Sequence, residues 1–173
     1  MNSFKDSILV FSHPDDECLF ASSLLNKSST LVICFNKIPN NPKISKGRKK
    51  ALKNYPLKNI NLINFEINQS EESFLPQNWL NIKDKDTGLK GGYKKKIYDE
   101  NFQKILLKLR KIIPNKSLIV THNPWGEYGH SEHCQVFKAC FQISKETDSK
   151  LFVTGYISNL SKYYAMRKLL FIG

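Results

Sequence analysis

The chain has 173 residues, enough for one domain with its own core, and 40% of them are hydrophobic. Lys and Arg outnumber Asp and Glu by 27 to 15, which gives a formal net charge of +12 at pH 7. The four cysteines form no Cys-x-x-Cys pair, which excludes the common zinc-finger spacings. No signal peptide is recognisable, and no apolar run reaches the roughly 18 residues of a membrane span. We therefore expect a cytoplasmic protein of one domain, 1–173, with no transmembrane segment.

Short apolar runs alternate with segments of helical periodicity along the whole chain. The apolar runs predict buried strands at 8–11, 31–35, 60–65, 118–121 and 151–154. Helical spacing predicts helices at 16–25, 45–54, 97–113 and 131–146. Because strands separated by helices are typical of βαβ units, we expect an α/β fold. Its form would be a single-domain, Rossmann-like three-layer sandwich with a mostly parallel sheet and a long loop near 68–96.

The positive charge is concentrated around the second predicted helix, since no Asp or Glu occurs between Asn36 and Ile63. Two explanations stay open: a solvated basic face in a lysine-rich chain, or a surface for an anionic ligand. Only three residues are arginine, so we expect no nucleic-acid recognition. Neither G-x-G-x-x-G nor the P-loop spacing occurs, so no nucleotide cofactor is implied.

All four histidines lie in two short clusters that also contain acids. His13 belongs to Ser12-His-Pro-Asp-Asp-Glu17, directly after the first predicted strand, and the other three lie in the segment 121–133 after the fourth. Because ligands bind where the carboxyl ends of parallel strands meet, we expect the two clusters to form one site. The alternative for the first cluster is a well-capped helix start, since Pro14 and the acids that follow it suit a helix N-terminus.

The spacing within the clusters suits a metal ion. His13 and Asp16 are three residues apart across a turn, and His130 and His133 are three apart at a helix start. A catalytic zinc site uses three protein ligands and leaves one position open. His13 and Asp16 with either His130 or His133 would supply three, while the spacing alone does not say which histidine is the third.

The segment 12–17 and Gly129-His-Ser-Glu-His133 resemble the paired motifs of the PIG-L/LmbE-like zinc-dependent N-deacetylases. That family includes enzymes acting on N-acetylglucosaminyl phosphatidylinositol and on mycothiol and bacillithiol precursors. The resemblance implies Zn²⁺ bound by the second histidine of the pair together with His13 and Asp16, although Fe²⁺ also suits such ligands. It implies that Asp15 is the general base and that His130 stabilises the oxyanion as an imidazolium.

Three residues are candidates for contact with the substrate, one from the resemblance and two from the chemistry of the loop 123–128. Arg48 resembles the family's substrate-contacting arginine, and its alternative is one more cation of a basic helix. Trp125 and Tyr128 suit stacking on a sugar, and their alternative is packing within the loop. His122 is expected to form hydrogen bonds at its strand end, and Glu17 to hold its turn.

The sequence thus predicts a zinc-dependent hydrolase that removes an N-acetyl group from an amino sugar or its conjugate. The substrate would be a small N-acetylglucosamine-type molecule, anionic if the basic helix contacts it. Two alternatives stay open: a metal-dependent amidase for a non-sugar N-acyl substrate, and a non-enzymatic, metal-stabilised basic binding module. A homo-oligomer is compatible with the sequence.

Overall fold

The computed structural model describes residues 4–70 and 95–157, together with residues 159, 162 and 166. Strands and helices alternate along the chain, as expected. The elements, in chain order, are β1 (Ile8–Phe11), α1 (Asp16–Ala21), the 3-10 helix η1 (Ser22–Leu24), β2 (Thr30–Lys37), α2 (Pro42–Lys53), β3 (Asn61–Asn68), α3 (Lys95–Ile112), β4 (Leu118–Thr121), α4 (Gly126–Gly129), α5 (Ser131–Glu146) and β5 (Lys150–Val153).

Two boundaries differ from the sequence prediction in ways that affect the site. The first helix ends at Ala21 and continues as η1, so the single helix predicted over 16–25 is wrong in its second half. The third strand extends to Asn68, three residues beyond the predicted end, and therefore places Gln69 at the end of the sheet where the strands have their carboxyl termini. The long loop expected near 68–96 lies largely outside the described residues.

The five strands form one sheet in the order β3-β2-β1-β4-β5, and all neighbours are parallel. The predicted α/β fold with a parallel sheet is therefore confirmed. The chain starts in the middle of the sheet, adds β2 and β3 on one side, and then returns to add β4 on the other. This reversal places the carboxyl ends of β1 and β4 side by side, the position where open α/β sheets bind their ligands.

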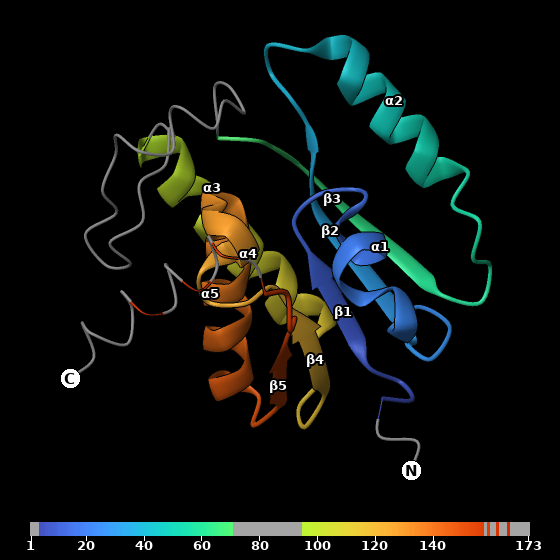
Figure 1. Cartoon of the computed structure of the whole chain (residues 1–173), viewed down its shortest axis with the longest axis vertical. Coiled ribbons are helices and arrows are strands. Elements are labelled where there is room, and N and C mark those ends of the chain that lie inside the picture. Colours follow the sequence, from blue (N-terminus) through green and yellow to red (C-terminus); the bar gives the residue numbers. More distant parts are fainter. Residues whose placement is uncertain (1–3, 71–94, 158, 160–161, 163–165, 167–173) are drawn as a thin grey trace.

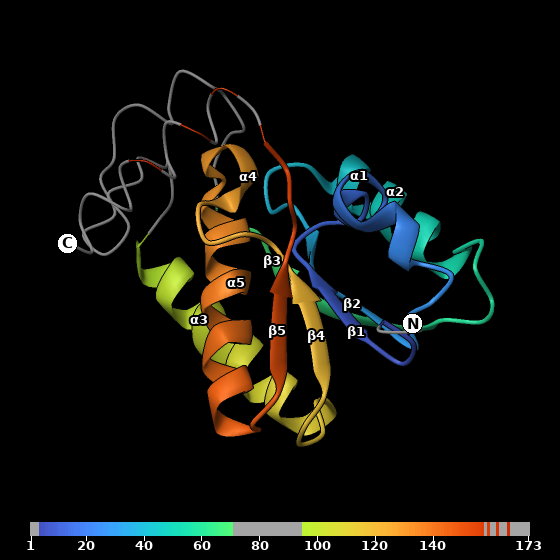
Figure 2. The same cartoon turned by 60° about the horizontal axis from the view of Figure 1, so that its bottom comes forward.

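Helices cover both faces of the sheet, α3 and α5 on one side and α1 and α2 on the other (Figures 1 and 2). Neighbouring residues of β1 point to opposite faces, so Val10 packs in the core under α3 and α5 whereas Leu9 packs in the other core. Burial on both faces explains why β1, β2 and β4 are continuous apolar runs rather than alternating ones. Among the described residues, no helix has the length and apolar character to cross a membrane.

Candidate metal centre

The first histidine cluster forms a tight turn between β1 and α1. The backbone N–H of His13 donates to Asp16 Oδ2 at 2.7 Å, and the same oxygen lies 3.3 Å from His13 Nδ1. Asp15 has φ 129° and ψ −29°, a strained conformation for a residue with a side chain. Its N–H donates to Glu17 Oε2 at 3.0 Å. The buried Glu17 carboxylate thus helps to hold the strained turn, in keeping with the role expected from the sequence.

Glu127 is the centre of the second cluster, and sequence analysis missed it. Its carboxylate is fully buried and accepts hydrogen bonds from His122 Nδ1 at 2.9 Å and His133 Nδ1 at 2.8 Å. It also accepts from the Asn123 backbone N–H at 3.1 Å and from the Thr154 hydroxyl, which lies just beyond β5. Burial opposes ionisation of Glu127, but the two imidazoles outweigh it and lower the pKa of the carboxyl. A single carboxylate therefore orients two histidines.

The loop reaches this arrangement through unusual backbone conformations. Glu127 has φ 58° and ψ −70°, which is rare for a residue with a side chain. Gly126 precedes it with φ 64°, and a Cβ there would lie 2.9 Å from Cys134 Sγ. Only glycine fits at this position without displacing the start of α5. The one signal in the sequence was a single acid between two glycines, Gly126 and Gly129.

Asp16 lies close to both histidines that are predicted to bind the metal with it. Asp16 Oδ2 lies 3.3 Å from His13 Nδ1 and 3.4 Å from His133 Nε2. Zinc bonds to nitrogen and oxygen of about 2.0–2.2 Å place neighbouring tetrahedral ligand atoms about 3.3 Å apart. His133 Nε2 is buried and has no hydrogen-bond partner among the described residues, while its Nδ1 is bonded to Glu127. An unpartnered imidazole nitrogen beside a carboxylate oxygen fits a metal ligand, so these residues suit zinc.

His122 lies beside this group but is unsuited to be a ligand. Its Nε2 is 3.4 Å from Asp16 Oδ2, and Asp16, His122 and His133 are close enough together to hold an ion. However, His122 Nε2 accepts the Ser12 backbone N–H at 3.0 Å, and its Nδ1 is bonded to Glu127. Both ring nitrogens are therefore engaged. The ring stacks on His133 at 3.9 Å, so His122 holds the His133 ring in place in addition to forming the hydrogen bonds expected at the strand end.

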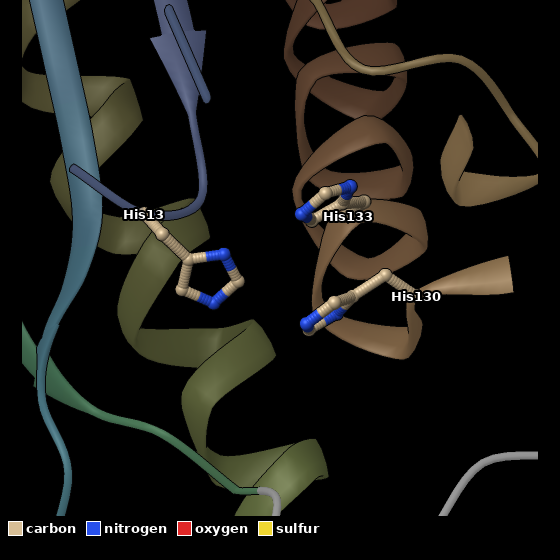
Figure 3. A group of neighbouring side chains, drawn as sticks. All are labelled: His13, His130 and His133. Carbon is tan, nitrogen blue, oxygen red and sulfur yellow. The ribbon is translucent and has the colours of Figure 1, made fainter. Parts of the chain in front are cut away.

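His130 faces the same space from the start of α5, opposite His13 (Figure 3). One nitrogen from each of His13, His130 and His133 lies within 4.8 Å of the others. His130 Nδ1 accepts the Glu132 backbone N–H at 3.2 Å and caps α5. Burial, and then His133 and His13, hold the pKa of His130 well below 6.5. The structure thus favours a neutral imidazole with its proton on Nε2, where the sequence analysis expected an imidazolium.

Glu132 supports His13 from the other side and was not predicted. Its Oε2 accepts from His13 Nε2 at 2.9 Å and from Gln69 Nε2 at 2.9 Å, while Oε1 accepts the Ser70 N–H at 2.6 Å. Burial lowers the pKa of His13, but Asp16 and Glu132 outweigh it and raise this pKa to about 10. A metal on Nδ1 would displace one proton and leave Nε2–H bonded to Glu132, the usual second contact of a metal-bound histidine.

Asp15 and the predicted substrate residues surround this centre in different ways. Asp15 is exposed, and partial desolvation followed by the Asp16 carboxylate raises its pKa. Arg48, on α2, donates to Gln69 Oε1 at 2.9 Å and so borders the site. The Tyr128 ring lies edge-on to His133 at 5.7 Å. Trp125 instead packs against Cys134 of α5.

Comparison with known proteins identifies the family of this chain. The sequence profile of the PIG-L family, described as GlcNAc-PI de-N-acetylase, matches residues 8–144. The chain belongs to the PIG-L family. It is also 26% identical over 178 residues to an uncharacterized protein of Acanthamoeba polyphaga mimivirus. That alignment covers 92% of this chain and 65% of its viral relative, so the chain spans less than two thirds of the relative's length. The PIG-L match includes both histidine clusters and every strand except β5.

Proposed function

We propose that this PIG-L family member is a zinc-dependent N-deacetylase for an amino sugar or its conjugate, with an N-acetylglucosamine-type substrate. The observation that carries the proposal is the position of Asp16 Oδ2, 3.3 Å from His13 Nδ1 and 3.4 Å from His133 Nε2. These distances fit neighbouring zinc ligands, and the base expected from the family, Asp15, is the adjacent residue. A structural zinc site would have no need of such a base.

The protein's own residues supply the proton transfers. Zinc held by His13, Asp16 and His133 would contribute a Lewis acid that polarises the amide carbonyl and acidifies water. Asp15 takes a proton from the attacking water and passes it to the leaving amine, a role suited to a carboxylate whose pKa is raised. His130 donates its Nε2–H to the developing oxyanion as a neutral imidazole. Acetate and a free amine are the products.

The residues around the centre support a sugar substrate. Tyr128 presents a ring edge-on to His130 and His133, at 6.1 and 5.7 Å, and a ring at this border can stack on a sugar face. Arg48 is only half-buried and keeps donors available for a hydroxyl or an anionic group. Trp125 would contact substrate only from the rim of the loop, since its ring packs on Cys134.

The test is amine release from zinc-loaded protein with a panel of N-acetylglucosamine conjugates and non-sugar N-acyl amides. We expect loss of one acetyl group, seen by mass spectrometry, from an N-acetylglucosamine conjugate. Asp15→Asn should keep its zinc and lose about 10²–10⁴ of the rate. Asp99→Asn makes the same change at an exposed position on α3 and should leave the rate unchanged. Equal rates for wild type and Asp15→Asn, or cleavage of non-sugar amides alone, would contradict the proposal.

A further inference from the structure

A second concave site lies beside the metal centre, between α2 and the carboxyl ends of β2 and β3. It is a cavity of about 370 Å³, bordered by Asn36, Ile38 and Pro39 after β2 and by Lys46 and Lys49 of α2. None of these residues has a part in the deacetylation chemistry. The cavity is large enough for a small organic molecule or its charged end group.

Asn36 is the main polar group of this cavity. It is 1% exposed, and its Oδ1 has no hydrogen-bond partner among the described residues. A buried amide oxygen without a partner is unfavourable, and native proteins rarely keep one without a reason. A half-turn of the amide exchanges its oxygen and nitrogen, so Asn36 can present either an acceptor or a donor to a ligand. Asn36 thus places a buried amide with one unused acceptor at the border of the cavity.

The charge around the cavity is positive. Lys46 and Lys49 are exposed and one turn apart on α2, and Lys37 lies on the opposite border. Glu66 is an acid at this border. It pairs with Lys37 at 3.2 Å and is also attracted by Lys49, although neither Lys46 nor Lys49 forms an ion pair among the described residues. The cavity also adjoins the first turn of α2, whose helix dipole favours an anion.

The cavity and the candidate metal centre are connected through residues adjacent in sequence to the cavity lining. Arg48 is the neighbour of Lys49, Gln69 is the neighbour of Asn68 on the cavity border, and the two are joined by a 2.9 Å hydrogen bond. On its other side, Gln69 contacts Glu132 and His13 at 2.9 and 2.7 Å. The Arg48–Gln69 pair therefore connects residues next to the cavity border with the candidate ligand His13.

We propose that this cavity binds the phosphate group of a phosphate monoester. Lys46 and Lys49 neutralise its charge, Asn36 hydrogen-bonds a phosphate oxygen or hydroxyl, and Ile38 and Pro39 contact the carbon skeleton. The phosphate either belongs to the acetylated substrate, an assignment that rests on the proposed deacetylase function, or to a separate ligand. A lysine-lined site suits a phosphate as a point charge and requires no arginine fork.

Binding is measured first, independently of activity, by calorimetric titration of zinc-loaded protein with N-acetylglucosamine 6-phosphate at fixed ionic strength. Replacing both Lys46 and Lys49 by Gln should weaken binding roughly tenfold or more, because two charge-assisted contacts are lost. The matched control replaces Lys50 and Lys53 of the same helix, which lie outside the cavity border, and should change affinity little. Asn36→Leu should also weaken binding without lowering the melting temperature, since it removes an unpartnered polar group.

Equal losses in the cavity pair and the control pair would show a general charge effect and overturn the proposal, as would unchanged affinity in the cavity pair. Steady-state kinetics then identify the source of the phosphate. A raised KM for the phosphorylated substrate, but not for neutral N-acetylglucosamine, assigns the phosphate to the substrate. Lost binding with unchanged kinetics assigns it to a separate ligand. Intact, lysine-dependent binding without any deacetylation would refute the proposed function and leave the phosphate site standing.

Discussion

The two histidine clusters contribute to one centre by different means. In the turn after β1, contacts join residues two or three positions apart, as between His13 and Asp16 or between Asp15 and Glu17. In the loop after β4, one buried carboxylate, Glu127, gathers His122, His133 and the distant Thr154. The geometry of the first cluster depends on the strained backbone at Asp15, and that of the second depends on the buried carboxylate of Glu127.

This difference has consequences for how each cluster tolerates substitution. The turn places a ligand and the expected base on adjacent residues, so a change at one can be separated from a change at the other. The loop joins its histidines through a shared acceptor, so a change at Glu127 affects both rings at once. Variants of each cluster should therefore separate metal binding, catalysis and stability in different patterns.

The largest effect is expected when Asp16, one of the two proposed metal ligands in the turn, is replaced. Asp16→Asn removes the carboxylate charge between His13 and His133. We expect zinc affinity to fall more than about 100-fold, which exceeds the loss typical when a residue that only hydrogen-bonds to a metal ligand is replaced. Competition with a chromogenic chelator measures this affinity. Asp15→Asn makes the same charge change one residue earlier and should bind zinc normally. Wild-type zinc affinity in Asp16→Asn would show that the ligand set is wrong.

Replacing Glu127 in the loop after β4 should lower zinc affinity less than Asp16→Asn does, and should lower the free energy of unfolding more. In Glu127→Gln the amide NH₂ replaces one of two acceptor oxygens. Either both imidazoles lose the Oε2 acceptor that they share, or the Asn123 N–H and the Thr154 hydroxyl lose Oε1. We expect zinc affinity to fall about 10–100-fold and the free energy of unfolding to fall about 3–5 kcal/mol, as when a buried pair loses one partner. Urea unfolding and chelator competition measure the two quantities.

The control for this variant is Glu146→Gln, which alters a surface pair with Arg110 at the end of α5. A solvent-exposed ion pair contributes little to stability, so little change is expected there. If Glu127→Gln were as mild as Glu146→Gln in both measurements, Glu127 would not be the residue that organises the loop.

Sequence patterns predicted the first cluster better than the second, for a physical reason. His13, Asp15 and Asp16 lie in one continuous motif, and their contacts follow from local spacing in a turn. The role of Glu127 arises only when Gly126 and Glu127 take positive φ values and Thr154 arrives from beyond β5. No periodicity in the sequence encodes such a conformation.

Gln69 and Glu132 were missed for a related reason. Gln69 reaches the site because β3 extends to Asn68, beyond the apolar run that predicted the strand. Glu132 looked like an ordinary acid in the first turn of a helix, which is a favourable position on any surface. Its burial against His13 depends on the packing of α5 beside β1, which is a tertiary contact. The order of strands and helices, by contrast, was readable from apolar runs alone.

The charge on His13 should make the stability of the metal-free protein depend on pH. Its pKa is raised to about 10 in the folded state, above the ordinary 6.5, because Asp16 and Glu132 outweigh burial. The stabilisation that protonated His13 contributes is fully present below pH 6.5 and is lost as the pH rises through about 10. Urea unfolding with chelator should therefore show a decline from neutral pH to about pH 10.

Zinc should reverse this trend, because the metal replaces a proton on His13 and binds more tightly as the pH rises. The difference in unfolding free energy between loaded and metal-free protein should widen with pH. In Asp16→Asn the decline of the metal-free protein should be weaker, since the main partner of His13 is gone. A metal-free protein whose stability rises over this range would contradict the assignment of His13 as the charged group.

The smallest effect tests how the strained turn is held. Tyr55, after α2, donates its hydroxyl proton to Glu17 Oε1 at 3.1 Å, and the other oxygen of Glu17 accepts the Asp15 N–H. Tyr55→Phe removes one hydrogen bond and should lower the free energy of unfolding by about 0.5–1.5 kcal/mol. Because the contact acts through Asp15, kcat should fall a few-fold while zinc content and KM stay unchanged. The same substitution in an Asp15→Asn background should leave the residual rate as it is. A loss of equal size in both backgrounds would mean that Tyr55 stabilises α2 alone and that the turn keeps its geometry without it.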